Sequence, residues 1–217
     1  MRSKDVTFTE AARRKQIVEA AIETIAELGY HQASVRKIAE RVGVAMSVVL
    51  YHFGSKDELV SAIVAELYRS VIATMQPLVA AESSAAGRLT AHIRAHIAYM
   101  AERRSHQVAL MEIGANFRSR DGKHLAEMES GLAPDELAQL ATVQLESVID
   151  SGIASGEFRS VPTDLVATAL RSAIGGAVPR LVADPDFDVH AYGEELVNVF
   201  VPSLTTDTPS PDTSRED

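Results

Sequence analysis

A short stretch of this chain, from Ser34 to Lys56, gathers polar side chains that can hold an anion. Hydroxyl, guanidinium, imidazole and ammonium groups occur there on Ser34, Arg36, Tyr51, His52 and Lys56. Donors of these kinds suit phosphate oxygens, and arginine and serine can also reach the edges of DNA bases. The chemistry that these residue types offer is therefore contact with a phosphate backbone.

Two short helices joined by a tight turn must position these side chains. Apolar residues at i, i+3, i+4 and i+7 predict the first helix, and they are Val35, Ile38, Ala39 and Val42. Ser34 can cap its first free N–H groups, and Gly43 can take the positive φ that ends it. The second helix has an apolar side of Val44, Val48, Val49 and Phe53, which leaves Ala45, Met46, Ser47, Tyr51 and His52 outward. The pattern predicts a helix-turn-helix, whose second helix meets the major groove.

With its flanks, the segment ELGYHQASVRKIAERVGVAMSVVLYHFGSKDELV resembles the DNA-binding domain of the TetR family of bacterial transcriptional regulators. The resemblance covers about residues 11–60 and includes Gly29-Tyr30, Gly43-Val44 and the run from Tyr51 to Lys56. It implies that Ser34, Tyr51, His52 and Lys56 hold the DNA backbone, while Arg36 and the start of the second helix read bases. The expected DNA-contacting set is Ser34, Arg36, Lys37, Ala45, Met46, Ser47, Val48, Tyr51, His52 and Lys56.

One residue departs from the family pattern. Leu50 stands where the family usually has Tyr, so one backbone-contacting hydroxyl is missing. We expect Leu50 to turn into the core instead. The reading helix is also poor in hydrogen-bonding groups, which favours specificity from Arg36, from Ser47 and from methyl contacts of Val48 or Ala45 with thymine.

Length and composition set further bounds. The 217 residues suffice for one or two modest domains, and the absence of cysteine excludes disulfides and thiol chemistry. No apolar run approaches the ~18 residues of a membrane span, and the N-terminus has no apolar segment typical of a signal peptide. These features predict a soluble protein of the cytoplasm with no membrane partner. The family resemblance implies a bacterial protein, and no cofactor is expected.

The charge is unevenly distributed along the chain. The formal net charge is −9, yet residues 1–56 carry 9 Lys or Arg against 6 Asp or Glu, and the remainder carries 12 against 24. A mildly basic head on an acidic body provides a localised phosphate-binding surface, because the acidic part disfavours non-specific wrapping of nucleic acid. The alternative is chance variation along the chain.

The pattern of apolar residues predicts an all-α fold. We expect a flexible arm (1–9), a three-helix DNA-binding domain (10–57), a helical effector-binding and dimerisation domain (58–204) and a disordered tail (205–217). A long helix over 57–80, which Pro77 kinks or ends, links head and body. Further helices are expected over 88–104, 106–117, 134–153, 164–181 and 189–204, and no strand is expected.

For the body, the resemblance implies an effector pocket and dimerisation through the last two helices. Adaptable residues at helical spacing are the pocket candidates, namely Met75, His96, Tyr99, Met100, Met111 and Phe117, although such residues more often belong to a core. Apolar stripes predict a dimer interface of Leu170, Ile174, Val178, Tyr192, Leu196, Val199 and Phe200. The alternative is that both stripes are absorbed in the chain's own core.

One further constellation suggests other chemistry. His92 and His96 are four residues apart and share a helix face, so both can reach one metal ion. No cysteine and no acidic third ligand at a telling spacing accompany them, so we expect no metal and no catalytic set. Three hypotheses remain: a repressor released from its operator by a small molecule, a regulator that activates or senses a protein, and a helical enzyme or metal-binding protein.

Overall fold

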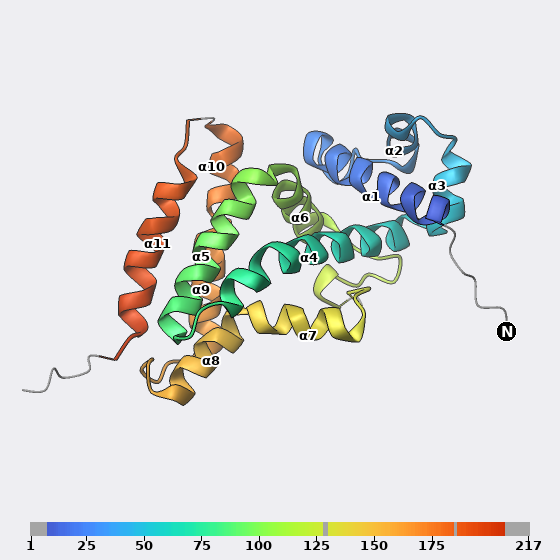
Figure 1. Ribbon diagram of the computed structural model, residues 1–217. Coiled ribbons are helices and arrows are strands. Elements are labelled where there is room, and N and C mark those ends of the chain that lie inside the picture. The colour runs from blue at the N-terminus through green and yellow to red at the C-terminus, as the bar shows by residue number, and fades with distance from the viewer. Residues whose placement is uncertain (1–7, 128–129, 185, 207–217) are drawn as a thin grey trace, which may run out of the picture. The chain divides into compact units, whose positions relative to one another are not determined.

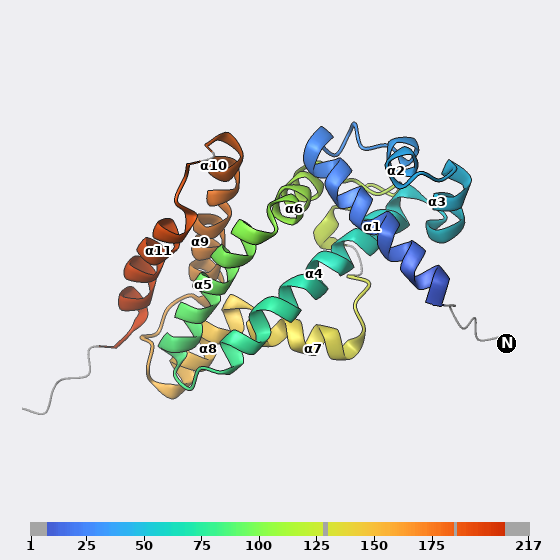
Figure 2. The same ribbon diagram turned by 45° about the horizontal axis from the view of Figure 1, so that its top comes forward.

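The structure is a computed structural model that describes residues 8–127, 130–184 and 186–206. Over these residues it is helical and has no strand, apart from one isolated antiparallel bridge between Phe158 and Thr205. The chain divides into two compact units, Met1–Ile72 with Tyr99–Leu137 and Ala73–Ala98 with Ala138–Asp217. Figures 1 and 2 label the α-helices, which are α1 (Phe8–Leu28), α2 (Val35–Val42), α3 (Met46–Phe53), α4 (Lys56–Ala80), α5 (Ala85–Glu102), α6 (Arg104–Asn116), α7 (Pro134–Val143), α8 (Leu145–Ser155), α9 (Thr163–Gly175), α10 (Ala177–Ala183) and α11 (Val189–Leu204). A short 3-10 helix, η1 (Leu125–Glu127), lies between α6 and α7 in the sequence.

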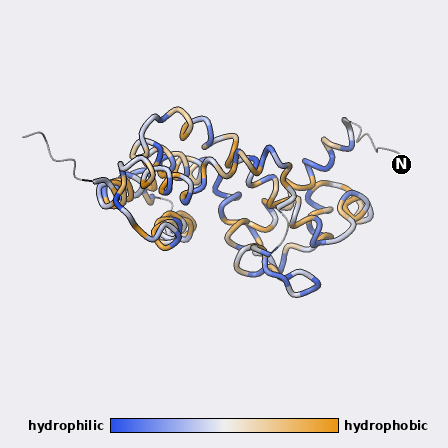
Figure 3. Tube along the Cα trace, turned by 90° about the horizontal axis from the view of Figure 1, so that it is seen from below, coloured by the Kyte–Doolittle hydropathy of each residue, from blue (hydrophilic) through white to orange (hydrophobic). Residues whose placement is uncertain are grey.

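In the first unit, α1 packs against both α2 and α6, and α2 packs against α3. One apolar cluster joins these helices with the first half of α4, including Ile22, Phe53 and Ile63. Apolar and polar residues alternate along the helices (Figure 3), as expected for helices that bury one face. The predicted helix-turn-helix therefore stands on a core to which α6, from outside the predicted head, also contributes.

A chain of polar groups runs through this unit. The Tyr99 hydroxyl lies 2.8 Å from Nδ1 of His106 and also makes a hydrogen bond with Ser70. Nε2 of His106 faces Oε1 of Glu19 at 3.5 Å. Burial raises the pKa of Tyr99, and the hydrogen bond from Ser70 opposes that shift. Because these four residues lie on α1, α4, α5 and α6, their polar contacts link four helices of the unit.

In the second unit, α9 packs against α8, α10 and α11, and Figures 1 and 2 both show α11 beside α9 and α10. The helices approach closely where glycine removes a side chain. A Cβ at Gly193 of α11 would lie 2.9 Å from Cγ1 of Ile97, and one at Gly152 of α8 would lie 2.2 Å from Cδ2 of Phe158. These two glycines allow α11 to meet α5 and α8 to meet the loop after it.

Two expectations about helix limits are wrong. The helix expected over 134–153 is two helices that meet at Gln144, whose extended backbone interrupts the run. The helix expected over 164–181 is divided at Gly176 into α9 and α10. By contrast, α4 keeps close to the predicted limits of 57–80, with Pro77 inside its last turn. Most of the expected arm and tail lies outside the described residues.

The segment Thr163–Ala183, which holds α9 and α10, also departs from the expectation that no apolar run is long enough to span a membrane. Among the described residues this segment alone is long and apolar enough to span a membrane, judged by its length and composition. Only 28% of its most apolar part is buried within the protein. The exposed part of this segment is mixed, since it includes Leu165 and Val182 as well as Arg171 and Arg180.

Candidate nucleic-acid interface

The N-terminus of α2 forms as the sequence predicts. Ser34 accepts a hydrogen bond from the backbone N–H of Lys37 at 3.3 Å, and Gly43 ends the helix with a φ of 75°. Arg36 and Lys37 lie exposed on the first turn, where Nε of Arg36 pairs with Glu40 at 2.9 Å. This exposed ion pair is weak, so the Arg36 guanidinium is free to exchange its partner for a base edge or a phosphate.

Helix α3 has a buried side and an exposed side. Val49 and Phe53 are buried in the core of the unit, whereas Val48 and His52 are half-buried. The exposed side holds Ser47 and Tyr51 together with Ala45 just before the helix and Met46 at its start. The outward set predicted from the sequence is thus brought onto one short helix, although Val48 contributes less surface than expected.

The expectation that Leu50 turns into the core is wrong. Its side chain is 38% exposed. Val49 and Phe53 already fill the position that α3 presents to the core, and Leu50 follows Val49 by one residue, about 100° further around the helix. Leu50 instead lies on the same flank as Met46, one turn earlier.

Lys56 begins α4 beside the loop that ends α1. Its ammonium lies 4.2 Å from the Tyr30 ring centroid and 3.4 Å from the Tyr30 carbonyl oxygen. Burial lowers the pKa of Lys56, and the carboxylate of Asp57 opposes this shift. Ser55 accepts a hydrogen bond from the backbone N–H of Glu58 at 3.1 Å, which caps α4. The ammonium therefore lies fixed at the positive end of a helix, a suitable position for a phosphate group.

Sequence reasoning missed the role of Arg14. The Arg14 guanidinium donates to the His52 carbonyl at 2.7 Å and lies 4.2 Å from the Phe53 ring centroid. Burial lowers the pKa of Arg14, and Glu58 opposes the shift. The guanidinium thus holds the C-terminal turn of α3 against α1. No sequence signal reveals this contact, since its partners are 38 residues apart.

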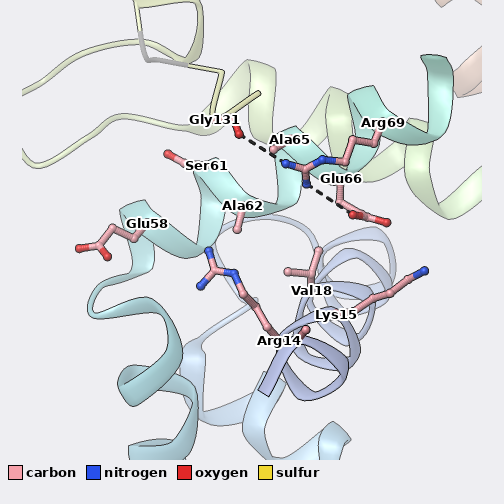
Figure 4. A pocket seen from close by; sticks show the side chains of 11 residues that line it. Arg14, Lys15, Val18, Glu58, Ser61, Ala62, Ala65, Glu66, Arg69 and Gly131 are labelled. Atoms are coloured by element: carbon pink, nitrogen blue, oxygen red, sulfur yellow. Dashed lines mark hydrogen bonds and ion pairs between the residues drawn. The ribbon is translucent and has the colours of Figure 1, made fainter. Parts of the chain in front are cut away.

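Arg14 also lines a groove of about 680 Å³ between α1 and α4. Figure 4 shows its guanidinium between the two helices, with Arg69 reaching toward Glu66 and the Gly131 carbonyl. Arg69 also pairs with Glu136 at 2.7 Å. The charges that border the groove are of both signs, and Arg14 and Arg69 are already engaged.

The residues predicted for the effector pocket are not gathered into one surface of either unit. Met75, Tyr99, Met100 and Phe117 are buried, His96 is half-buried and Met111 is exposed. Phe117 belongs to the core that supports the helix-turn-helix, with its ring 6.2 Å from that of Tyr30. In the second unit, a groove of about 560 Å³ borders Leu78 of α4, one turn from Met75, and Ala95 of α5, which directly precedes His96.

His92 is nearly fully buried in that unit, and its Nδ1 has no hydrogen-bond partner among the described residues. Burial lowers the pKa of His92 to about 3, and the nearby His96 contributes. Burial likewise lowers the pKa of His96 to about 4, with a contribution from Arg171. Within the described residues no group of three or more His, Cys, Asp or Glu is placed to hold a metal ion.

Four of the seven residues predicted for a dimer interface are buried in the chain's own core, namely Leu170, Ile174, Val178 and Leu196. Tyr192 is half-buried and donates a hydrogen bond to the Ala173 carbonyl at 2.5 Å. Phe200 is also half-buried, whereas Val199 is 61% exposed. Leu165 on α9 and Val182 on α10 are further exposed large apolar residues.

Comparison with known proteins yields consistent matches. The family model described as bacterial regulatory proteins, tetR family, matches residues 17–63. The fatty acid metabolism regulator protein of Bacillus subtilis is 25% identical over 194 residues, which is 87% of this chain and 94% of that protein. The HTH-type transcriptional regulator BetI of Cronobacter sakazakii is 28% identical over 191 residues, covering 77% of this chain and 94% of the relative. The crystal structure of the regulator FadR from B. subtilis with stearoyl-CoA has a TM-score of 0.70 at 24% identity and covers 87% of this chain and 98% of that one.

Proposed function

We propose that this chain, which belongs to the TetR family of bacterial regulatory proteins, is a dimeric repressor that binds a palindromic operator and releases it when a small molecule binds. The observation that carries the proposal is the outward face of α3. It is exposed, it follows a capped α2, and it stands on a packed core.

The polar groups divide by role. Ser34 and Lys56 lie at the N-termini of α2 and α4, where free N–H groups and the helix dipole favour a phosphate. Tyr51 and His52 add a hydroxyl and an imidazole to the same backbone contacts. Arg36 and Ser47 are exposed and can reach base edges, with arginine suited to guanine.

Dimerisation supports operator binding, because two reading helices fit successive major grooves only when they lie about 34–36 Å apart. The proposed interface is the exposed apolar surface of α9, α10 and α11, centred on Leu165, Val182 and Val199. An apolar surface that a soluble chain leaves uncovered favours association with a second copy. Leu170, Ile174, Val178 and Leu196 support this surface from beneath.

For the effector, the second unit is the proposed location. FadR from B. subtilis was crystallised with stearoyl-CoA, so a long apolar ligand with an anionic head is the first class to test. The far end of α4 and the middle of α5 border one groove in this unit, which is the proposed place for such a ligand.

The proposal can be tested by measuring fluorescence anisotropy of labelled DNA from the region upstream of the chain's own gene. We expect nanomolar binding that saturates at two chains per duplex and is reversed by stearoyl-CoA or another acyl-CoA. Binding no tighter than to a shuffled duplex of the same composition would contradict the DNA-binding role, whereas tight binding that no acyl-CoA reverses would contradict only the effector class.

A further inference from the structure

The exposed side of α3 includes an apolar flank. Met46 and Leu50 are one helical turn apart, and their side chains are 49% and 38% exposed. Ser47 and Tyr51, the next pair around the helix, are also exposed. Val49 and Phe53 point into the core, so the core cannot absorb Met46 or Leu50 without rotation of the whole helix. Such a rotation would expose Phe53 and remove the Arg14 guanidinium from its ring.

An uncovered apolar pair on a reading helix requires a partner in the complex with DNA. The major groove offers one kind of apolar group on its base edges, the C5-methyl of thymine. That methyl lies toward the wall of the groove, beside the deoxyribose of its own strand. When the helix lies in the groove, the residues on its flank face that wall, whereas the residues that point straight away from the protein core do not.

The polar groups available around this flank are few. Ala45 precedes Met46 and has only a methyl group to offer, and Val48 is half-buried on the opposite flank. Leu50 has no donor for a phosphate oxygen. Ser47 and Tyr51 offer hydroxyl groups on the neighbouring side of the helix. Met46 and Leu50 offer none, so apolar contact is the recognition that their own flank can provide.

We propose that Met46 and Leu50 form an apolar contact surface that selects thymine by its C5-methyl group. The inference rests on the proposed function and deepens it, because it states what part of the operator the apolar flank reads. Half-sites bound by this protein contain thymine at the position facing Leu50, and cytosine or uracil there lowers affinity.

The test begins with selection of duplexes from a random-sequence library by the full chain. Each thymine of the selected half-site is then replaced in turn by deoxyuridine, which removes the methyl group and keeps every hydrogen-bonding atom. Loss of one buried methyl should weaken binding about fourfold at one or two positions. Deoxyuridine outside the half-sites should leave affinity unchanged.

The double variant Met46→Ala, Leu50→Ala completes a cycle with the deoxyuridine duplexes. Both side chains lie on the surface, so the variant should fold, which circular dichroism checks. It should bind the thymine and deoxyuridine duplexes equally, within about 1.5-fold, whereas Met111→Ala, an exposed methionine on α6, should keep the fourfold difference.

If no single deoxyuridine weakens a specific complex, the inference is overturned and the proposed function stands. The same holds if the double variant keeps the fourfold difference. If the library yields no preferred duplex, both the inference and the DNA-binding role are overturned. The deoxyuridine series on the unmodified protein decides the question even if the variant does not fold.

Discussion

Replacement of Tyr99 by Phe tests the polar chain that joins α1, α4, α5 and α6. Tyr99 is 1% exposed, and its hydroxyl makes hydrogen bonds with His106 and Ser70. The change preserves the ring but leaves Nδ1 of the buried His106 without a partner. Each hydrogen bond contributes about 1 kcal/mol and an unpaired buried group costs about 1–3 kcal/mol, so we expect a loss of roughly 2 kcal/mol in the free energy of unfolding.

The assay is urea unfolding followed by circular dichroism, together with thermal unfolding. In a chain of this size, roughly 2 kcal/mol lowers Tm by about 4–8 °C. Tyr68→Phe is the matched control, because the Tyr68 hydroxyl makes no hydrogen bond in the described part of the chain and its loss should cost under about 0.5 kcal/mol. A second variant, His106→Leu, removes the group that Tyr99→Phe leaves unpaired.

The double variant Tyr99→Phe, His106→Leu should therefore be more stable than the sum of the two single losses, by about 1 kcal/mol or more. Additivity within about 0.5 kcal/mol, or a Tyr99→Phe protein as stable as Tyr68→Phe, would refute the idea that this chain of polar groups stabilises the first unit.

Four other outcomes are expected. Burial lowers the pKa of His92 to about 3 and that of His96 to about 4, while an unfolded imidazole titrates near 6.5, so stability is full above about pH 6.5 and falls as the pH drops; between pH 7 and pH 5 each imidazole should cost about 2 kcal/mol. His92→Gln should remove about half of the total loss and the exposed-residue control His190→Gln none of it, as urea midpoints would show, and an undiminished loss in His92→Gln would contradict this cause. If the chain forms the proposed dimer, Val199→Glu should convert it to monomers in analytical ultracentrifugation, whereas Glu195→Gln, also exposed on α11, should not; a dimeric Val199→Glu protein would exclude this interface. Lys56→Ala should weaken binding to every DNA sequence alike and reduce the slope of log affinity against log salt by about 0.9, and a loss confined to one operator variant would argue against a phosphate contact. Gly152→Ala should lower stability by about 1–3 kcal/mol in urea unfolding because its Cβ would overlap the Phe158 ring, while Gly156→Ser, in open space but at a φ of 79°, tests backbone strain separately.

Local signals in the sequence predicted both ends of α2, the helix that precedes the reading helix α3. Ser34 caps α2 and Gly43 ends it at a positive φ, since both effects depend on residues within one turn. The limits of α11 were also predicted, because Asp188 caps its start and the tail beyond Leu204 is polar. The TetR resemblance rests on the same short segment, which the family model also matches.

Long-range contacts account for what the sequence could not predict. Tyr99 and His106 lie on different helices, and Glu19 is 87 residues from His106, so no periodicity relates them. The side of α3 on which Leu50 lies is set by Val49 and Phe53 as they enter a core that includes Phe117 of the distant loop after α6. The division at Gly176 was missed because α9 and α10 form one uninterrupted apolar pattern.

The binding constant of the full chain for a selected operator, relative to a shuffled duplex at 150 mM salt, tests the central claim most directly. A sequence-specific dimeric regulator should prefer the operator by roughly 10³-fold or more, with two half-sites about one helical turn apart. Equal affinity for the two duplexes would contradict the account.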